Sequence, residues 1–461
     1  MTFWSPDPTL LRRPAYLSLA DQIARAIHEG KLANGERLPP QRKMAHELSL
    51  SVQTVSRAYE DLIRRGLVSG EIGRGSFVQT MRREPDPPYL PERLGEVIDL
   101  SILKPVCEAM HHERLKQGLG WLAENLPANS ALSFRPNVVF PRHAAVAVEW
   151  LRRCGIEAST QNVTVTNGAT AGMTVALMSV APPGSTVAME VVGHHTLRPL
   201  ANYLGFNLDG LAVDEDGMIP EALDAACRRH DIRAVFLQPS VMNPRAVLMS
   251  QARREALAAV ARQHDIAIIE NDVLGPLVED RPPPVAAIAP ERTIYITSFT
   301  KITVPGLRIG YLAAPDRYVA AATNRHLVTN WMATPMVADI ASQWVLDGTA
   351  LDLMMWQRAA LRRRQAIAAE VLQGVRYRSH RDALHLWLPL RGERTEAGFV
   401  AQARLLGVAV APGESFRVAD GGTQPAVRVA LGSTGEDELR AGLGMIAKLL
   451  LGDPEMPLLA I

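Results

Sequence analysis

The sequence predicts two joined parts: an N-terminal winged helix-turn-helix and a larger α/β body with a mostly parallel sheet and a small α+β domain at its C-terminal end. Three helical patterns followed by a hairpin pattern fill roughly the first eighty residues. Beyond them, helical patterns alternate with short β-rich runs, which is typical of a parallel sheet covered by helices. The length of 461 residues also favours more than one domain.

The first part contains clear helix signals. In SLADQIARAIHEG, residues 18–30, the apolar side chains fall on one helical face, with Ser18 as the predicted cap. A short helix is predicted in QRKMAHELSL and a longer one in SVQTVSRAYEDLIRRG, where Ser51 is the predicted N-cap. The segments LVSG and GSFV, joined by the turn EIGRG, form the predicted wing. The buried stripe of the longer helix is expected to contain Val52, Val55, Tyr59 and Leu62.

A winged helix-turn-helix binds DNA by placing the second helix of its helix pair in the major groove. Residues at the start of that helix should therefore contact base edges, and basic residues nearby should contact phosphates or the minor groove. The alternative is a basic face on a protein-interaction domain. The predicted DNA-contacting residues are Ser51, Gln53, Thr54, Ser56 and Arg57, with Arg42 and Arg74 at the backbone.

The blocks LPPQRKMAHELSLSVQTVSRAYEDLIRRGLV and GRGSFV closely resemble the DNA-binding domain of the GntR family of bacterial regulators. The resemblance implies a double-stranded DNA operator as partner. We assign residues 1–80 to this domain and the proline-rich residues 81–96 to a linker. Residues 97–461 form the body, whose small domain is expected at about 350–461, where ALHLWLPL, VAVAPG and AVRVALG read as strands.

The composition indicates the charge distribution, the redox compartment and the relation to membranes that we expect for the protein. Residues 1–83 carry 13 Lys and Arg against 8 Asp and Glu, whereas the rest carry 36 against 40, so a basic module precedes a mildly acidic body. The three cysteines are widely spaced and match no metal-binding pattern, so we expect a reducing cytoplasm and no zinc or other metal. No apolar run reaches the roughly 18 residues of a spanning helix, and neither secretion nor membrane insertion is expected.

In the body, polar groups follow several predicted strands. VTNGATAGM predicts a strand, a turn and a helix start, where the backbone N–H groups of residues 168–170 can face an anion. Asn243 follows AVFLQP, Asp272 ends IAIIEND, and Lys301 follows TIYITSF. In a parallel sheet these loops open at the same C-terminal edge, where ligands bind. Taken singly, Lys301 also fits a solvated surface lysine, and VTNGATAGM also fits an ordinary tight strand-to-helix turn.

Together these groups match what pyridoxal phosphate requires. Its aldehyde needs a lysine amine, its ring nitrogen an acid, its 3′ oxygen a hydrogen-bond donor, and its phosphate backbone amides and a cation. A flat side chain must cover the ring, and His194 fits that place, although an ordinary half-buried histidine is the alternative. The matching residues are Lys301, Asp272, Asn243, and Gly168, Ala169 and Thr170 with Arg308.

SFTKITVPGLRIGY, residues 298–311, is similar to the lysine motif of fold type I aminotransferases, S-x-S-K followed by P-G-L-R-x-G. Residues 97–450 therefore resemble a pyridoxal-phosphate-dependent transferase of fold type I, and the whole chain resembles the MocR subgroup of GntR regulators. The resemblance implies a Schiff base at Lys301, phosphate contacts from Ser298 and Arg308, Asp272 at the pyridine nitrogen, Asn243 at the 3′ oxygen, His194 on the ring, and Arg428 at a substrate α-carboxylate.

Departures from the family pattern bear on the chemistry. The tyrosine that usually stands two residues after the aspartate is replaced by Leu274, which removes a hydrogen bond to the 3′ oxygen and should weaken proton transfer. The common N-P-x-G is NPRA, Val192 replaces the proline before the stacking position, and Thr300 replaces the serine before Lys301. Cofactor binding survives these changes better than fast transamination does.

The sequence thus predicts a transcriptional regulator that senses pyridoxal phosphate, or the aldimine it forms with an amine or amino acid, through an aminotransferase-like domain. An active aminotransferase carrying a DNA-binding domain is the alternative, and a scaffold with an empty site is a third reading. A B6 vitamer, an amino acid or another small amine all remain open as the effector. The resemblance also implies a homodimer; the operator and the sign of regulation stay open.

Overall fold

The computed structural model describes residues 4–29, 31–33, 35–64, 67–71, 75–78, 97–132, 134, 141–392, 394–418 and 423–452. The chain divides into two compact units, residues 1–91 and residues 92–461, and each is described by itself. The predicted linker 81–96 and the predicted DNA contact Arg74 lie outside the described residues. Within the described ranges, no helix has the length and apolar character needed to cross a bilayer.

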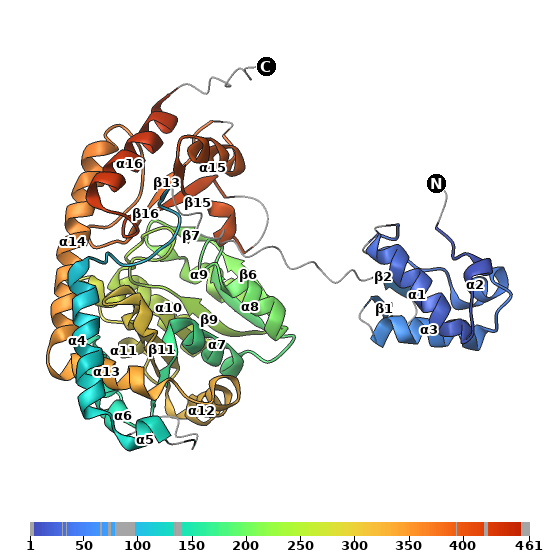
Figure 1. Cartoon of the computed structure of the whole chain (residues 1–461), viewed down its shortest axis with the longest axis horizontal. Helices are drawn as coiled ribbons and strands as arrows, with labels where there is room; N and C mark the ends of the chain where they lie inside the picture. The colour runs from blue at the N-terminus through green and yellow to red at the C-terminus, as the bar shows by residue number, and fades with distance from the viewer. Residues whose placement is uncertain are drawn as a thin grey trace. The chain divides into compact units, whose positions relative to one another are not determined.

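The first unit is a winged helix-turn-helix, as predicted (Figure 1). Its two strands pair antiparallel, with Val68 opposite Val78. Leu19 and Ile23 from the first helix pack against Val55 and Leu62 from the third in a single core. After a 3-10 turn at Pro8–Leu10, the elements are α1 (Ala15–His28), α2 (Gln41–Glu47), α3 (Val52–Arg64), β1 (Val68–Glu71) and β2 (Gly75–Val78).

Local details of the helix starts confirm one expectation and correct two. The Ser51 hydroxyl accepts a hydrogen bond from the backbone N–H of Thr54 at 3.1 Å, so Ser51 caps α3. Helix α1 begins earlier, at Ala15, and the Ser18 hydroxyl instead donates to the carbonyl of Leu10 at 3.2 Å. Val52, expected in the buried stripe, is 45% exposed because it is the first residue of α3 and precedes the turn that packs on the core.

The second unit is built on a seven-stranded sheet in the order β4-β12-β11-β10-β9-β5-β6. Strand β12 is antiparallel to both of its neighbours, and every other neighbouring pair is parallel. All strands except β12 therefore end at the same edge, as the sequence predicted for a mostly parallel sheet. The strands are β4 (Val163–Thr166), β5 (Thr186–Glu190), β6 (Asn207–Leu211), β9 (Ile232–Leu237), β10 (Ala267–Asn271), β11 (Thr293–Ser298) and β12 (Gly310–Ala313).

Helices cover both faces of this sheet (Figure 1). On what we call the α7 face, Ile294 and Ile296 of β11 pack with Met173 of α7 and with α8 and α12. On the α6 face, Tyr295 packs with Trp150 of α6, with α13 and with α14 (Thr349–Val371), and α9 to α11 continue this layer. The helices are α4 (Ala109–Asn125), α5 (Ala128–Leu132), α6 (Pro141–Arg153), α7 (Gly168–Val180), α8 (Leu197–Leu204), α9 (Pro220–Arg229), α10 (Gln251–Gln263), α11 (Val285–Ile288), α12 (Asp316–Asn330) and α13 (Pro335–Leu346).

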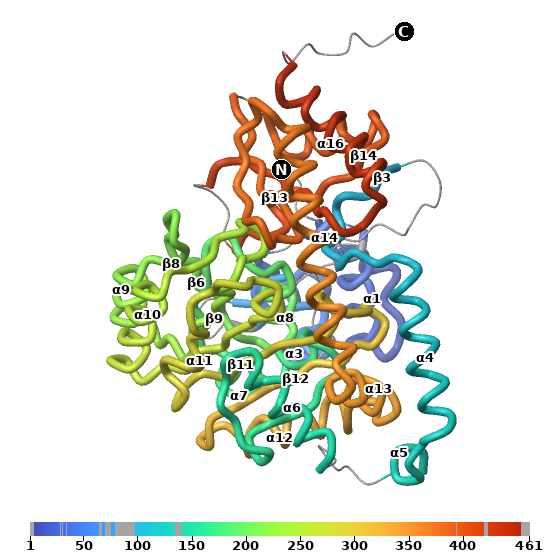
Figure 2. Tube along the Cα trace, turned by 90° about the vertical axis from the view of Figure 1, so that its left-hand side faces the viewer, coloured from blue at the N-terminus to red at the C-terminus, as the bar shows by residue number. Residues whose placement is uncertain are grey.

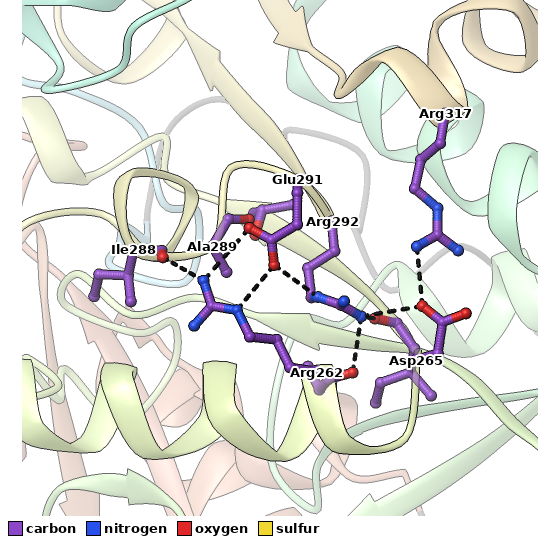
Figure 3. Close-up of polar contacts among 10 residues, drawn as sticks. Arg262, Asp265, Ile288, Ala289, Glu291, Arg292 and Arg317 are labelled. Atoms are coloured by element: carbon purple, nitrogen blue, oxygen red, sulfur yellow. Dashed lines mark hydrogen bonds and ion pairs between the residues drawn. The ribbon is translucent and has the colours of Figure 1, made fainter.

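An ion-pair network ties the N-terminal edge of the sheet together, opposite the edge where the predicted site lies (Figure 3). Arg262 pairs with Glu291 at 3.0 Å, and Arg317 pairs with Asp265 at 3.0 Å. Arg292, next to β11, contacts both carboxylates. Each of these arginines therefore has an acidic partner.

The small domain has a three-stranded antiparallel sheet in the order β13-β16-β15, covered by helices. Residues just after the predicted linker also belong to it: β3 (Ile98–Asp99) pairs with β14 (Val408–Ala409), and the two lie side by side in Figure 2. Leu100 is fully buried in the same core. The small domain is thus assembled from both ends of the second unit, which local patterns did not predict. Its other elements are α14 (Thr349–Val371), β13 (His385–Pro389), α15 (Glu396–Leu405), β15 (Ala411–Pro412), β16 (Ala426–Ala430) and α16 (Glu436–Leu451).

Candidate functional site

Lys301 lies at the C-terminal edge of the large sheet, in a 3-10 turn directly after β11. The Ser298 hydroxyl starts this turn by accepting a hydrogen bond from the N–H of Thr300 at 3.0 Å. The Lys301 ammonium donates to the carbonyl oxygen of Leu103. Burial, with the positive charges of Arg428 and Arg308, lowers the pKa of Lys301 to about 8. A sizeable fraction of this amine is therefore neutral near physiological pH, and the neutral form attacks carbonyl carbons.

Gly168 and Arg308 form the next part of the rim. Gly168 is the first residue of α7 and has φ +79°, and a β-carbon there would lie 3.1 Å from Nη2 of Arg308. Arg308 has φ +49°, a left-handed conformation that non-glycine residues keep only where the surroundings enforce it. The guanidinium thus lies beside the first turn of α7, which includes Ala169 and Thr170 and whose backbone N–H groups have no partner within the helix. This arrangement suits a phosphate.

Arg428 reaches the same rim from β16 of the small domain. Its Nη1 donates to Oδ1 of Asn243 at 2.8 Å, and its Nη2 donates to the carbonyl of Ser101 at 2.5 Å. Its guanidinium lies 4.8 Å from the centre of the Phe416 ring. Asn243 and Arg428, which the sequence placed far apart in the chain, are therefore in direct contact.

His194 lies in the loop after β5. Its ring stacks on His195 with centroids 5.0 Å apart and lies edge-on to Phe236 of the α7 face at 6.1 Å. Burial lowers the pKa of His194 well below its ordinary value, and the charges of His195, Lys301 and Arg428 act in the same direction. The imidazole is accordingly neutral and shares the rim with the lysine and the arginine.

Asp272 does not join this group. Its Oδ2 accepts a hydrogen bond from the Tyr295 hydroxyl at 2.7 Å and forms an ion pair with Arg281. Tyr295 belongs to the α6 face. A β-carbon on Gly275 would lie 2.2 and 2.3 Å from the two carboxylate oxygens, so the turn after β10 covers the carboxylate.

The neighbouring residue Asn271 points the other way. Its Nδ2 lies 3.2 Å from the sulfur of Met173 on α7, and its Oδ1 is buried with no partner among the described residues. Asn271 was not among the site residues predicted from the sequence. The alternation of side chains along a strand predicts that Asn271 and Asp272 face opposite sides of the sheet, but not which of the two faces the rim.

On the first unit, the predicted DNA-contacting side chains lie on the side of the helix pair that faces away from the core. Ser51, Gln53, Arg57 and Arg42 are exposed, whereas Thr54 and Ser56 are half-buried. The Arg57 guanidinium lies 5.3 Å from the Tyr16 ring. The start of α3 therefore presents several exposed polar side chains, together with the exposed Val52.

Two family models match the chain: bacterial regulatory proteins of the gntR family over residues 15–78, and aminotransferase class I and II over residues 134–445. Curated relatives span both parts. YdeF, an HTH-type transcriptional regulator of Bacillus subtilis, is 27% identical over 97% of this chain and 96% of its own length. PtsJ, a vitamin B6 salvage pathway transcriptional repressor of Salmonella typhimurium, is 27% identical over 91% of this chain and 94% of its own length.

Among solved structures, a kynurenine aminotransferase of Pyrococcus horikoshii matches with a TM-score of 0.71 at 21% identity, over 77% of this chain and 91% of that one. This likeness shows the fold of the body, that of the fold type I transferases, for which pyridoxal 5′-phosphate is the cofactor. The chain therefore belongs to the aminotransferase class I and II family, and its GntR-type helix-turn-helix gives it the architecture of the MocR transcriptional regulators.

Proposed function

We propose that this DNA-binding regulator senses pyridoxal phosphate, or a small amine that reacts with it, through the rim around Lys301. One observation carries the proposal: a half-buried lysine with a lowered pKa lies on the same rim as a helix N-terminus with an adjacent arginine. Among the described residues, neither Lys301 nor Arg308 forms an ion pair, so the rim holds positive charge that an anionic ligand would neutralise. Bound pyridoxal phosphate supplies an electrophilic carbon that gives the site reactivity toward amines.

The chain's own residues would divide the work of binding. Lys301 would capture the aldehyde and His194 would cover the ring. Asn243 would hold the 3′ oxygen, and Arg428 would take the carboxylate of an amino-acid effector in a bidentate contact. The phosphate would be held by Gly168, Ala169, Thr170, Ser298 and Arg308.

A vitamin B6 compound is the effector class that the comparisons favour, since one relative is by name a repressor of vitamin B6 salvage. An effector regulates only if it binds two conformations with different affinity. Arg428 and Phe416 come from the small domain and Lys301 from the large one, so a ligand that contacts both would favour one placement of the small domain over another.

We propose a cytoplasmic homodimer, because two winged helices suit paired half-sites on DNA. On each copy, Gln53 and Arg57 would contact base edges, with Ser51, Thr54 and Ser56 beside them. Arg42 and Arg74 would contact the backbone.

The test compares the full chain with Lys301→Ala. The wild-type protein should acquire visible absorbance with pyridoxal phosphate, at a rate that rises toward pH 8 and levels off above it because the neutral amine reacts. The variant should lose this absorbance and the effect of pyridoxal phosphate on binding to the chain's own upstream DNA, while its salt-sensitive DNA binding persists. Unchanged absorbance in the variant would refute the proposal. Steady multiple turnover with an amino donor would identify an active aminotransferase instead.

A further inference from the structure

We infer that Asn271, and not Asp272, faces the ring nitrogen of the cofactor, so that a neutral amide stands where an electron-sink site has a carboxylate. The inference rests on the proposed function, because it takes pyridoxal phosphate as bound at Lys301. It follows from the side of the sheet on which each group lies.

The groups that would hold the cofactor lie on the α7 side of the sheet edge. The phosphate cradle is the N-terminus of α7 itself, where Gly168 meets Arg308. Ser298 follows Ile296 by two positions on β11, and Ile296 packs in the α7 cluster. The His194 ring lies against Phe236 of the same cluster. A ring bound between these groups therefore presents its nitrogen to side chains of the α7 face.

On β10, the residue of that face at the sheet edge is Asn271. It follows Ile269, a member of the α7 cluster, by two positions, and it pairs in register with Ile296. Its amide is buried, yet the partner of its Nδ2 is the weakly accepting sulfur of Met173, and its Oδ1 has no partner among the described residues. Buried amides are normally satisfied, and the Nδ2 group of Asn271 carries two hydrogens, so one N–H remains that a ring nitrogen could accept.

Asp272 is occupied on the opposite face. Arg281 pairs with its carboxylate and also donates to the carbonyl of Cys154 at 2.5 Å. Arg281, Cys154 and Gly275 line a cavity of about 420 Å³ on that side. To reach a ring on the α7 face, Asp272 would have to leave a buried arginine without its partner, which is strongly unfavourable.

An amide at the ring nitrogen would affect cofactor binding and catalytic turnover differently. An amide can donate its N–H to an unprotonated ring nitrogen, but it carries no negative charge to stabilise a protonated one. A protonated ring withdraws electrons more strongly than an unprotonated one and so speeds proton abstraction from a bound amine. Asn271 thus permits the cofactor to bind and keeps its reactivity low, a combination that suits a sensor.

The test uses pyridoxal phosphate labelled with ¹⁵N in the ring, bound to the full-length protein and observed by NMR. The wild type should show the resonance of an unprotonated nitrogen near pH 7. Asn271→Asp should move it to the protonated position and tighten cofactor binding by about tenfold, because a charge-assisted hydrogen bond replaces a neutral one. Asp272→Asn and the milder Tyr295→Phe, which removes one hydrogen bond to Asp272, should leave the resonance where it is.

A protonated nitrogen in the wild type that is lost in Asp272→Asn, or displaced in Tyr295→Phe, would overturn the inference and leave the sensing proposal standing. Absence of any bound cofactor signal in the wild type would refute the sensing proposal itself. Should Asp272→Asn fail to fold, the Tyr295→Phe and Asn271→Asp pair decides the question alone.

Discussion

The two edges of the large sheet use similar residues in opposite ways. At the N-terminal edge, Arg262, Arg292 and Arg317 are all matched to Glu291 or Asp265, so charge is neutralised within the protein. At the C-terminal edge, Lys301 and Arg308 form no ion pair among the described residues, and Asp272, which follows β10 at this edge, pairs with Arg281 on the other face. The comparison indicates that the charges at the N-terminal edge stabilise the fold, whereas the unpaired cations at the C-terminal edge are suited to binding an anionic ligand.

The largest effect is expected from a substitution at Arg308, on the C-terminal edge. Replacing the exposed arginine by methionine should weaken pyridoxal phosphate binding by about 10- to 100-fold, the range expected for loss of one charge-assisted contact. The stability of the cofactor-free protein should change by less than about 0.5 kcal/mol, since no ion pair is lost. Titration of the cofactor absorbance and thermal unfolding check both parts. A large loss of stability without a loss of affinity would mean that Arg308 is structural.

Glu190, at the end of β5, provides a second test of the comparison, because it is a buried acid at the C-terminal edge of the sheet. Neither carboxylate oxygen has a hydrogen-bond partner on another described residue, and burial raises the pKa of Glu190 to about 7. The folded state thus holds this proton more tightly than the unfolded state, and the associated stability is full below the ordinary carboxyl pKa and is lost as pH rises to about 7. Glu190→Gln should raise the free energy of unfolding at pH 8 by about 2 kcal/mol and leave it unchanged at pH 4.

Urea unfolding at the two pH values measures this effect. Equal stabilisation at both would show that packing, not ionisation, is responsible. A loss of stability at pH 8 would show that the charged carboxylate has a favourable partner.

The smallest effect is expected at Arg317, the matched control for Arg308 on the N-terminal edge. Its side chain is 42% exposed and that of Asp265 is 73% exposed, so the pair is well solvated. Arg317→Met should cost at most about 0.5 kcal/mol and leave cofactor affinity unchanged. Affinity that fell as far as in Arg308→Met would show that the two edges are not independent.

Features carried by contiguous residues were predictable from the sequence. The lysine motif at residues 298–311, the cap at Ser51 and the four strand-ending loops all follow from local spacing, and the structure brings Lys301, Arg308, Asn243 and His194 to one rim. The Asn271 and Asp272 pair was not predictable in the same way. Which of two adjacent residues faces a ligand depends on which layer of helices covers each side of the sheet, and that is decided by residues far away in the chain.

The pairing of β3 with β14 was beyond local reasoning for the same reason, since it joins Ile98 to Val408. It has a mechanical consequence. The DNA-binding unit precedes this strand in the chain, and the residues after the strand accept hydrogen bonds from two of the side chains proposed to bind the ligand: Ser101 from Arg428 and Leu103 from Lys301. A ligand that binds Arg428 or Lys301 would compete with a hydrogen bond to a main-chain carbonyl, and that carbonyl lies within a few residues of the predicted linker. A change in the backbone at Ser101 or Leu103 on ligand binding is therefore separated by only a few residues from the segment that joins the body to the DNA-binding unit.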